Sequence, residues 1–311
     1  MNALRLHLEQ YLRLRRAMGF QLHDVARQLD RFVCHLKEQG LPHITTAAVA
    51  AWISSLPVSP NTKASRFGMI RYFARYVRAA DPRHEVPPAQ LFPSRRRRQA
   101  PYIYSDGEVA QLIHAARQIP WAAGSCAKTF TTLLGLLVVT GMRIGECLAL
   151  NAPDVDLEEG VLTVVETKFR KSRLIPLHPS TLEQLQRYSR WRNRQFPRPR
   201  SPSFLVSSRG TRLWKGNVRI TFHRLSRQIG IRHAGVRHGP RLHDFRHTFA
   251  VKTLRTWHDA GVDVEQHLPE LATYLGHTHV SDTYWYLTGT PELLQVVAAR
   301  IDRLGEERTA T

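Results

Sequence analysis

Apolar residues recur at helical spacing through about the first 80 positions of the chain. Leucines at positions 4, 8 and 12 follow one helical face with arginines between them, and the same period returns in three later segments. The last of these opens with Ser59-Pro60, a serine cap followed by proline at the first helical position. The pattern predicts an all-α domain of four short helices over 2–17, 22–38, 45–53 and 59–77.

Periodicity stops between residues 80 and 101. This segment contains five prolines and the run Arg95-Arg96-Arg97-Arg98. Proline clusters interrupt helices and favour extended backbone. We therefore expect one domain over 1–90, a basic linker over 91–101 and a second domain over 102–311.

The pattern of the second domain is mixed. A capping box at 105–108 begins an apolar helix, and residues 131–140 are apolar on every side, which predicts a buried central helix. Runs rich in β-branched residues at 161–165 and 173–177 predict a small antiparallel sheet, and a short strand is expected at 204–206. Further helices are expected at 180–194, 216–229, 243–257, 268–275, 280–287 and 291–304. The fold class is mainly α (α+β).

The charge of the chain points to a polyanionic partner. Lys and Arg number 45 against 25 Asp and Glu, a net charge of +20. Such an excess favours DNA or RNA, because each phosphate that is neutralised releases counterions. On the fourth helix Lys63, Arg66, Arg71 and Arg75 alternate with the apolar face. A solvated helix face explains any single one of them equally well, but together they favour DNA.

Other compositional features narrow the class of protein. No run approaches the roughly 18 apolar residues of a membrane span, and the amino terminus has no secretory signal pattern. Cys34, Cys126 and Cys147 are widely separated in apolar surroundings. They are typical of reduced core cysteines in a cytosolic protein, and their spacing does not suggest a metal site.

The segment with the most chemistry is His243-Asp244-Phe245-Arg246-His247, followed by Leu275-Gly276-His277 and, nine residues later, Tyr286. Residues three and four apart on a helix share a face, so His243, Arg246 and His247 can converge on one small target. A fixed guanidinium group, histidines and a tyrosine suit a phosphodiester that is attacked by a phenol oxygen.

Two further stretches supply cations. Arg143 lies at a helix start, where it can pair with Glu146 or meet a phosphate, which a helix amino terminus favours. Lys168 and Lys171 lie in the basic turn of the predicted hairpin. They are either solvated turn lysines or reach into a site.

The residues leave other classes of protein open. A zinc hydrolase is suggested by His243, His247, His277 and His279, but Asp244 stands where the zinc-protease motif has Glu. A DNA-binding regulator with an inactive site is the main alternative. The intact set of basic residues and tyrosine argues against it.

Over about residues 100–290 the chain resembles the tyrosine recombinases, the phage-integrase type of site-specific recombinase, and the four amino-terminal helices resemble their core-binding domain. Five segments in family order carry the resemblance: 140–146, 167–177, 243–247, 275–277 and Tyr286.

The resemblance assigns a role to each position. Arg143 and Arg246 would hold the phosphate, with His277 as a further donor, because charge gathers on its nonbridging oxygens. Tyr286 would be the nucleophile and His243 its proton acceptor. Lys168, favoured over Lys171 by alignment, would protonate the departing 5′ oxygen. His247 and Glu146 would support the site. Spacing favours Tyr286 over Tyr284, which is expected to pack beside Trp285 or in the core.

The same resemblance implies the reaction and its partners. A 3′-phosphotyrosyl intermediate would be attacked by the 5′ hydroxyl of another strand, so neither ATP nor metal is required. The two domains would form a C-shaped clamp on duplex DNA, and four protomers would synapse. The helix at 291–304 would either contact a neighbouring protomer or pack on its own domain. Arg95, Arg96, Arg97, Arg98 and Lys171 would face the duplex. We expect a cytoplasmic, nucleoid-associated bacterial protein that serves a mobile element or replicon.

Overall fold

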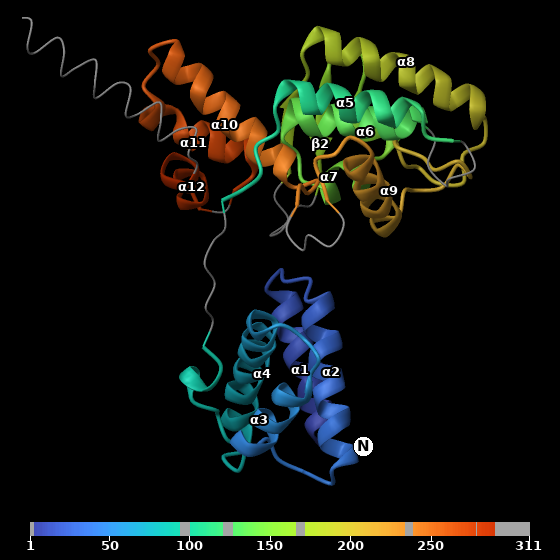
Figure 1. The fold of residues 1–311 in the computed structure, drawn as a ribbon. Coiled ribbons are helices and arrows are strands. Elements are labelled where there is room, and N and C mark those ends of the chain that lie inside the picture. The colour runs from blue at the N-terminus through green and yellow to red at the C-terminus, as the bar shows by residue number, and fades with distance from the viewer. Residues whose placement is uncertain are drawn as a thin grey trace, which may run out of the picture. The chain divides into compact units, whose positions relative to one another are not determined.

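The computed structural model describes residues 3–93, 100–120, 127–165, 172–233, 239–277 and 279–289. The chain divides into two compact units, and the division falls between Gln99 and Ala100. Each unit has its own buried core. Figure 1 shows the helices and strands of both units.

The first unit is the predicted bundle of four helices. They are α1 (Ala3–Ala17), α2 (His23–Glu38), α3 (Thr46–Ser55) and α4 (Pro60–Ala80), followed by the 3-10 turn η1 (Ala89–Leu91). Thr45 caps α3 by accepting a hydrogen bond from the Ala48 amide, and Ser59 caps α4 in the same way. The apolar face of each helix turns inward, and the largest fully buried side chains in this core are Phe32 and Phe73.

The second unit is mostly helical with one small sheet, so the predicted mainly α (α+β) class is confirmed (Figure 1). Its helices are α5 (Asp106–Arg117), α6 (Ala127–Thr140), α7 (Ile144–Ala149), η3 (Ala152–Asp154), α8 (Pro179–Gln195), α9 (Lys215–Gln228), α10 (Asp244–Asp259), α11 (Val264–Leu275) and α12 (Ser281–Gly289). Its strands are β1 (Val155–Asp156), β2 (Val161–Val164) and β3 (Arg173–Pro176).

Helix α6 lies at the centre of this unit, as its apolar sequence predicts. It packs against α5, α7, α8 and α10, and most of its side chains are buried. Gly141 ends it with a φ of +59°, a conformation that favours glycine. A Cβ at this position would lie 2.7 Å from the Phe249 ring. The close contact therefore brings α10 directly against the end of α6.

The sheet is antiparallel in the order β1-β2-β3. Strand β1 was not predicted, because two residues leave no readable alternation. Val164 is paired with Arg173 at the end of the ladder where the chain leaves β2 and enters β3. Residues 166–171, which contain Lys168 and Lys171, lie outside the described residues.

The predicted strand at 204–206 is wrong. Only isolated bridges flank it, Asn151 to Ser203 and Val206 to Arg212. The segment is buried, but side chains satisfy much of its backbone. The Tyr188 hydroxyl accepts the Val206 amide at 3.2 Å, and the Arg192 guanidinium donates to the Phe204 carbonyl at 3.4 Å. An apolar run therefore remains irregular when it has no strand beside it.

Helices α10, α11 and α12 form a second core at one end of the unit. It includes Leu254, Leu268, Leu275 and Tyr286. Helix α11 begins at Val264, earlier than the predicted 268, because Asp263 caps it and Pro269 is accommodated inside it. The predicted helix at 291–304 lies outside the described residues. Within the described ranges, no helix has the length and apolarity needed to cross a bilayer.

Removing the Tyr188 hydroxyl tests how the irregular segment is held. In Tyr188→Phe the buried Val206 amide loses its acceptor, and we expect the free energy of unfolding to fall by about 1–3 kcal/mol. Tyr72→Phe is the matched control, because Tyr72 is 64% exposed and should change stability little. Urea unfolding of both variants measures the difference, and equal midpoints would contradict the assignment.

Candidate active site

The start of α10 is fixed by buried polar contacts. The Asp244 carboxylate is buried and accepts hydrogen bonds from the Arg241 amide at 2.8 Å and the Arg241 guanidinium at 2.7 Å. The Tyr104 amide donates to the Thr248 hydroxyl at 2.9 Å. These contacts hold the first two turns of α10, and His243 lies directly before them. Part of the His243 side chain is exposed, while the rest is close enough to neighbouring groups to lose hydration.

Arg246 is the most deeply buried cation of the predicted set, with 1% of its surface exposed. Its guanidinium group donates to the Gly141 carbonyl at 3.1 Å and to the Leu275 carbonyl at 2.6 Å. Burial, and next the charge of Arg143, lower the pKa of Arg246 to about 10, so it remains a cation at neutral pH. Arg246 therefore joins the end of α6 to the end of α11.

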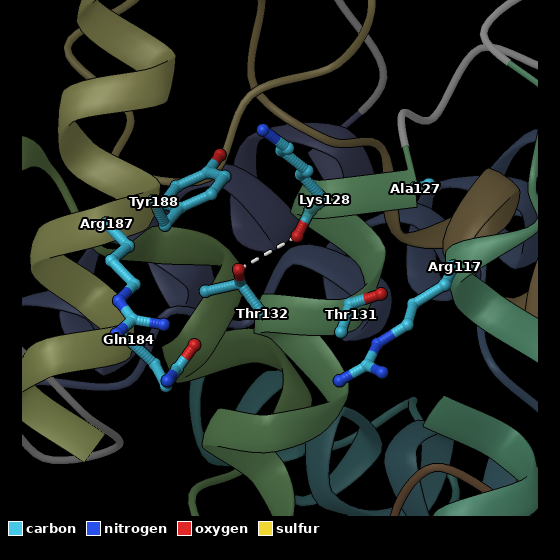
Figure 2. A pocket seen from close by; sticks show the side chains of 8 residues that line it. All are labelled: Arg117, Ala127, Lys128, Thr131, Thr132, Gln184, Arg187 and Tyr188. Atoms are coloured by element: carbon cyan, nitrogen blue, oxygen red, sulfur yellow. Dashed lines mark hydrogen bonds between the residues drawn. The ribbon is translucent and has the colours of Figure 1, made fainter. Parts of the chain in front are cut away.

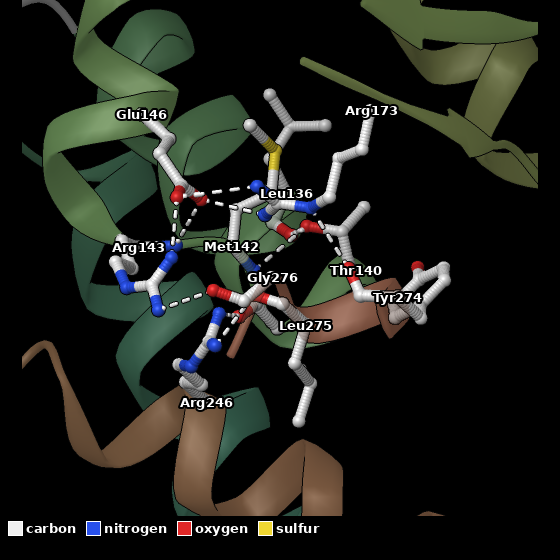
Figure 3. A network of polar contacts seen from close by, with 11 residues as sticks. Leu136, Thr140, Met142, Arg143, Glu146, Arg173, Arg246, Tyr274, Leu275 and Gly276 are labelled. Atoms are coloured by element: carbon white, nitrogen blue, oxygen red, sulfur yellow. Dashed lines mark hydrogen bonds and ion pairs between the residues drawn. The ribbon is translucent and has the colours of Figure 1, made fainter. Parts of the chain in front are cut away.

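Arg143 occupies the N-terminal cap position of α7. Its contacts bear on the two predicted alternatives, pairing with Glu146 and binding of a phosphate. It pairs with Glu146 at 2.8 Å and donates to the Gly276 carbonyl at 2.8 Å. The Glu146 carboxylate also accepts the Arg143 amide at 3.0 Å. Pairing with Glu146 thus does not remove Arg143 from the site but orients it toward α11 (Figure 3).

Sequence reasoning missed a third arginine in this cluster. Arg173, at the start of β3, donates to Glu146 at 2.7 Å and to the Tyr274 carbonyl at 2.8 Å. The neighbouring Leu174 is 64% exposed, whereas Ile175 is buried. Because strand side chains alternate between faces, Arg173 shares the inward face with Ile175. The sequence signal that could have revealed Arg173 was a cation at an inward-facing position of a predicted strand.

Tyr286 and Tyr284, two residues apart on α12, differ in how far their side chains are buried. Tyr286 is 2% exposed and its hydroxyl lies 2.9 Å from Nδ1 of His247. Tyr284 is 45% exposed, so the expectation that it packs in the core is wrong, because α12 buries only one face. The Tyr286 hydroxyl shares its hydrogen bond with His247, whereas the predicted proton acceptor was His243, whose ring lies 4.7 Å from that of His247.

The two remaining histidines are held neutral. His277 follows α11 directly, and its Nδ1 lies 2.7 Å from the buried Thr283 hydroxyl. Loss of hydration, and next the charge of Arg246, lower the pKa of both His243 and His277 to about 4. A neutral imidazole has one N–H donor and one nitrogen acceptor, so both rings can form hydrogen bonds at neutral pH.

The structure thus brings together Arg143, Glu146, His243, Arg246, His247, His277 and Tyr286, drawn from α7, α10, α12 and the end of α11. Lys168 lies outside the described residues, as do Arg95, Arg96, Arg97, Arg98 and Lys171. In the described part of the chain, no group of three or more His, Cys, Asp or Glu side chains is arranged to hold a metal ion.

The predicted basic face of α4 is partly engaged within its own unit. Lys63 donates to the Ser54 carbonyl at 2.6 Å, and Nε of Arg71 donates to the Pro87 carbonyl at 2.9 Å. Arg66 is half-buried and Arg75 is exposed. Arg75 is therefore the most accessible of the four predicted contacts.

A hollow between α5, α6 and α8 lies apart from these residues (Figure 2). Arg187 at its rim is paired with Glu183 at 2.5 Å, and the Lys128 ammonium lies 5.4 Å from the centroid of the Trp191 ring. Its other polar lining residues are Arg117, Thr131, Thr132, Gln184 and Tyr188. None of the predicted site residues lines it, so it has no part in the chemistry considered below.

Comparison with known proteins gives a consistent result. Residues 104–292 match the Phage integrase family. The putative integrase/recombinase y4rB of Sinorhizobium fredii is 44% identical over 314 residues, covering 99% of this chain and 100% of the relative. Tyrosine recombinase XerC of Vibrio parahaemolyticus is 25% identical, covering 92% of this chain and 89% of the relative.

Solved structures share the fold. The Tn1549 transposon integrase in complex with transposon right end DNA aligns with a TM-score of 0.65 and 17% identity, covering 97% of this chain and 100% of that one. A lambda integrase from a tetramer bound to a Holliday junction aligns with a TM-score of 0.57 and 20% identity, covering 89% and 77%. By its match over 104–292 and its close full-length relative, the chain belongs to the phage integrase family of tyrosine recombinases.

Proposed function

We propose that this chain is a site-specific DNA recombinase that cleaves and rejoins strands through a 3′-phosphotyrosyl intermediate on Tyr286. The observation that carries the proposal is the cluster itself. Two buried or half-buried arginines and a buried tyrosine paired with a histidine surround the end of one helix. Positively charged, water-poor surroundings are what a weak phenol nucleophile and a phosphodiester require.

In the cleavage step, the Tyr286 oxygen attacks phosphorus and the bond from phosphorus to the 5′ oxygen breaks. The phenol proton passes to a histidine. His247 is supported as this acceptor by its 2.9 Å hydrogen bond to Tyr286, and His243 remains beside it. The departing 5′ oxygen takes a proton from Lys168. Attack by a 5′ hydroxyl of another strand reverses these transfers and frees the tyrosine.

Three groups would hold the phosphate during this exchange. Arg246 and Arg143 each donate to carbonyl or carboxylate oxygens through two of their guanidinium nitrogens, and their other N–H groups would bind the nonbridging oxygens. His277, fixed by Thr283, adds a neutral donor. Glu146 supports the site by orienting Arg143.

We further propose the organisation that this chemistry needs. Residues 1–90 would bind duplex DNA, 91–101 would link the domains, and 102–311 would form the catalytic domain. Relatives whose names include a putative integrase and a transposon integrase support service to a mobile element. The lambda integrase tetramer on a Holliday junction supports assembly of four protomers on DNA.

A covalent-adduct assay tests the proposed function. Wild-type protein is incubated in EDTA with nicked duplex DNA taken from the gene's own flanking sequence and run on a denaturing gel. We expect a protein–DNA adduct that Tyr286→Phe abolishes, because the nucleophilic oxygen is gone. Tyr284→Phe is the matched control two residues away and should retain it. Loss of the adduct only in Tyr284→Phe would overturn the nucleophile, and no adduct despite a gel shift would favour a DNA-binding regulator.

The neutral histidines predict a pH dependence of stability. Below the ordinary pKa of 6.5, histidines of the unfolded chain take up protons that His277 and His243 in the folded chain resist until about pH 4. The unfolded state binds more protons in this window, so the free energy of unfolding should fall as the pH drops through it.

Glutamine variants isolate this effect in the DNA-free protein. His277→Gln should flatten the decline in melting temperature between pH 6.5 and about 4. His243→Gln should flatten it less, because His243 is exposed and water screens its interactions. An unchanged slope in His277→Gln would show that this ring takes up its proton at the same pH in the folded and the unfolded chain.

Salt dependence tests the contribution of α4. If Arg75 contacts a phosphate, Arg75→Ala should weaken DNA binding and make the slope of log affinity against log salt shallower by about 0.9. Arg13→Ala, an exposed arginine on α1 of the same unit, controls for the loss of net charge. Equal slopes for Arg75→Ala and the wild type would remove Arg75 from the interface.

A further inference from the structure

The end of α11 presents three consecutive carbonyl groups, and a different arginine binds each of them. Arg173 donates to the Tyr274 carbonyl, Arg246 to that of Leu275 and Arg143 to that of Gly276 (Figure 3). The last carbonyls of a helix have no partner within it and carry partial negative charge. This arrangement, the arginine clasp, is therefore favourable in charge and in hydrogen bonding.

Arg173 is the member of the arginine clasp with no assigned role. It shares the Glu146 carboxylate with Arg143: Arg173 donates to Oε2 at 2.7 Å and Arg143 to Oε1 at 2.8 Å. The side chain of Glu146 is mostly buried, at 9% exposed. Although burial alone would raise it, hydrogen bonds from Arg173, ahead of those from Arg143, lower the pKa of Glu146. Arg173 is thus the stronger of the two influences that keep this carboxylate ionised.

The backbone at Gly276 fits the same arrangement. Gly276 has a φ of +67°, and a Cβ there would lie 2.9 Å from a guanidinium nitrogen of Arg173 and 3.5 Å from one of Arg143. Both guanidinium groups therefore approach the residue directly before His277. A side chain at this position would displace Arg173 as well as strain the turn.

From these contacts we propose that Arg173 is a positioning residue, which fixes Arg143 through Glu146 and fixes the His277 turn through the Tyr274 carbonyl. The inference deepens the proposed function and rests on it for its catalytic consequence. The same side chain thus restrains two of the groups assigned to the reaction, Arg143 and His277.

Without Arg173, Glu146 has one arginine in place of two. Its carboxylate would then compete with the substrate phosphate for the donors of Arg143, and the turn before His277 would lose one of its contacts. A lysine cannot replace the fork, because a single ammonium does not match the Glu146 oxygens and the Tyr274 carbonyl at once. Both Arg173→Met and Arg173→Lys should therefore slow cleavage.

The control is another arginine of the same unit in a similar structural role. Arg212 donates to the Leu148 carbonyl at 2.6 Å and to the Asn151 side chain at 2.6 Å, but it does not contact Glu146. Arg212→Met removes a comparable pair of hydrogen bonds from the fold. Any effect of Arg173→Met beyond that of Arg212→Met then reports on the arginine clasp.

Two measurements decide the proposal. In the DNA-free protein, the Nε–H signal of the Arg143 guanidinium is followed by NMR. We expect Arg173→Met to shift it and speed its exchange with water, and Arg212→Met to leave it unchanged. In the adduct assay, Arg173→Met should slow adduct formation on the order of 10- to 100-fold with a smaller change in DNA affinity. Arg173→Met/Glu146→Gln should be no slower than the slower single variant, since the two residues act on Arg143 together.

An unchanged Arg143 signal in Arg173→Met, or losses that multiply in the double variant, would overturn the positioning role. If the wild type forms no adduct, the proposed function fails, but the NMR comparison still decides whether Arg173 positions Arg143. If the wild type forms an adduct and Arg173→Met equals Arg212→Met in both measurements, the proposed function stands and this inference fails.

Discussion

Burying a guanidinium group requires acceptors, and ending a helix inside a protein requires donors. The carbonyl end of α11 meets both requirements at once. Arg246 from α10, Arg143 from the start of α7 and Arg173 from β3 each bind one of its last three carbonyls. Three segments that are remote in sequence are thereby held at one point. The rest of the candidate site is arranged around that point, because His277 follows it directly and α12 packs against the same helix.

This constraint explains why the two cores of the second unit meet where they do. Arg246 links the carbonyl of Gly141, at the end of central helix α6, to that of Leu275, at the end of α11. The Phe249 ring packs against Gly141 one helical turn further along α10. Polar and apolar contacts thus fix the same junction, so α10 has little freedom to slide. Tyr286, buried in the α10–α12 core, is placed against His247 of a helix that is fixed in this way.

The local sequence pattern correctly predicted the features that interactions between neighbouring residues determine. The helices with strong caps, at Ser59 and Ser105, begin where the sequence indicates, and the motif helix carries Arg246 and His247 as expected, with His243 at its cap position. Two of the failures depend on distant partners. The run at 204–206 is irregular because Tyr188 and Arg192 bind its backbone, and Arg173 was overlooked because its acceptors lie 27 and 101 residues away. Resemblance to a family predicted which groups would react but not the contacts that hold them.

Positive charge in the cluster exceeds what its carboxylate can balance. Arg143, Arg173 and Arg246 face Glu146, while loss of hydration and the charge of Arg246 hold the pKa of His277 at about 4. A protonated histidine would add to the excess, whereas a phosphodiester would reduce it. The charge of the arginines adds to the loss of hydration in keeping the histidines neutral. Under the proposed function, the same charge also attracts the substrate. A bound phosphate would offset that charge and so oppose the second of the two causes that lower the pKa of His277 and His243.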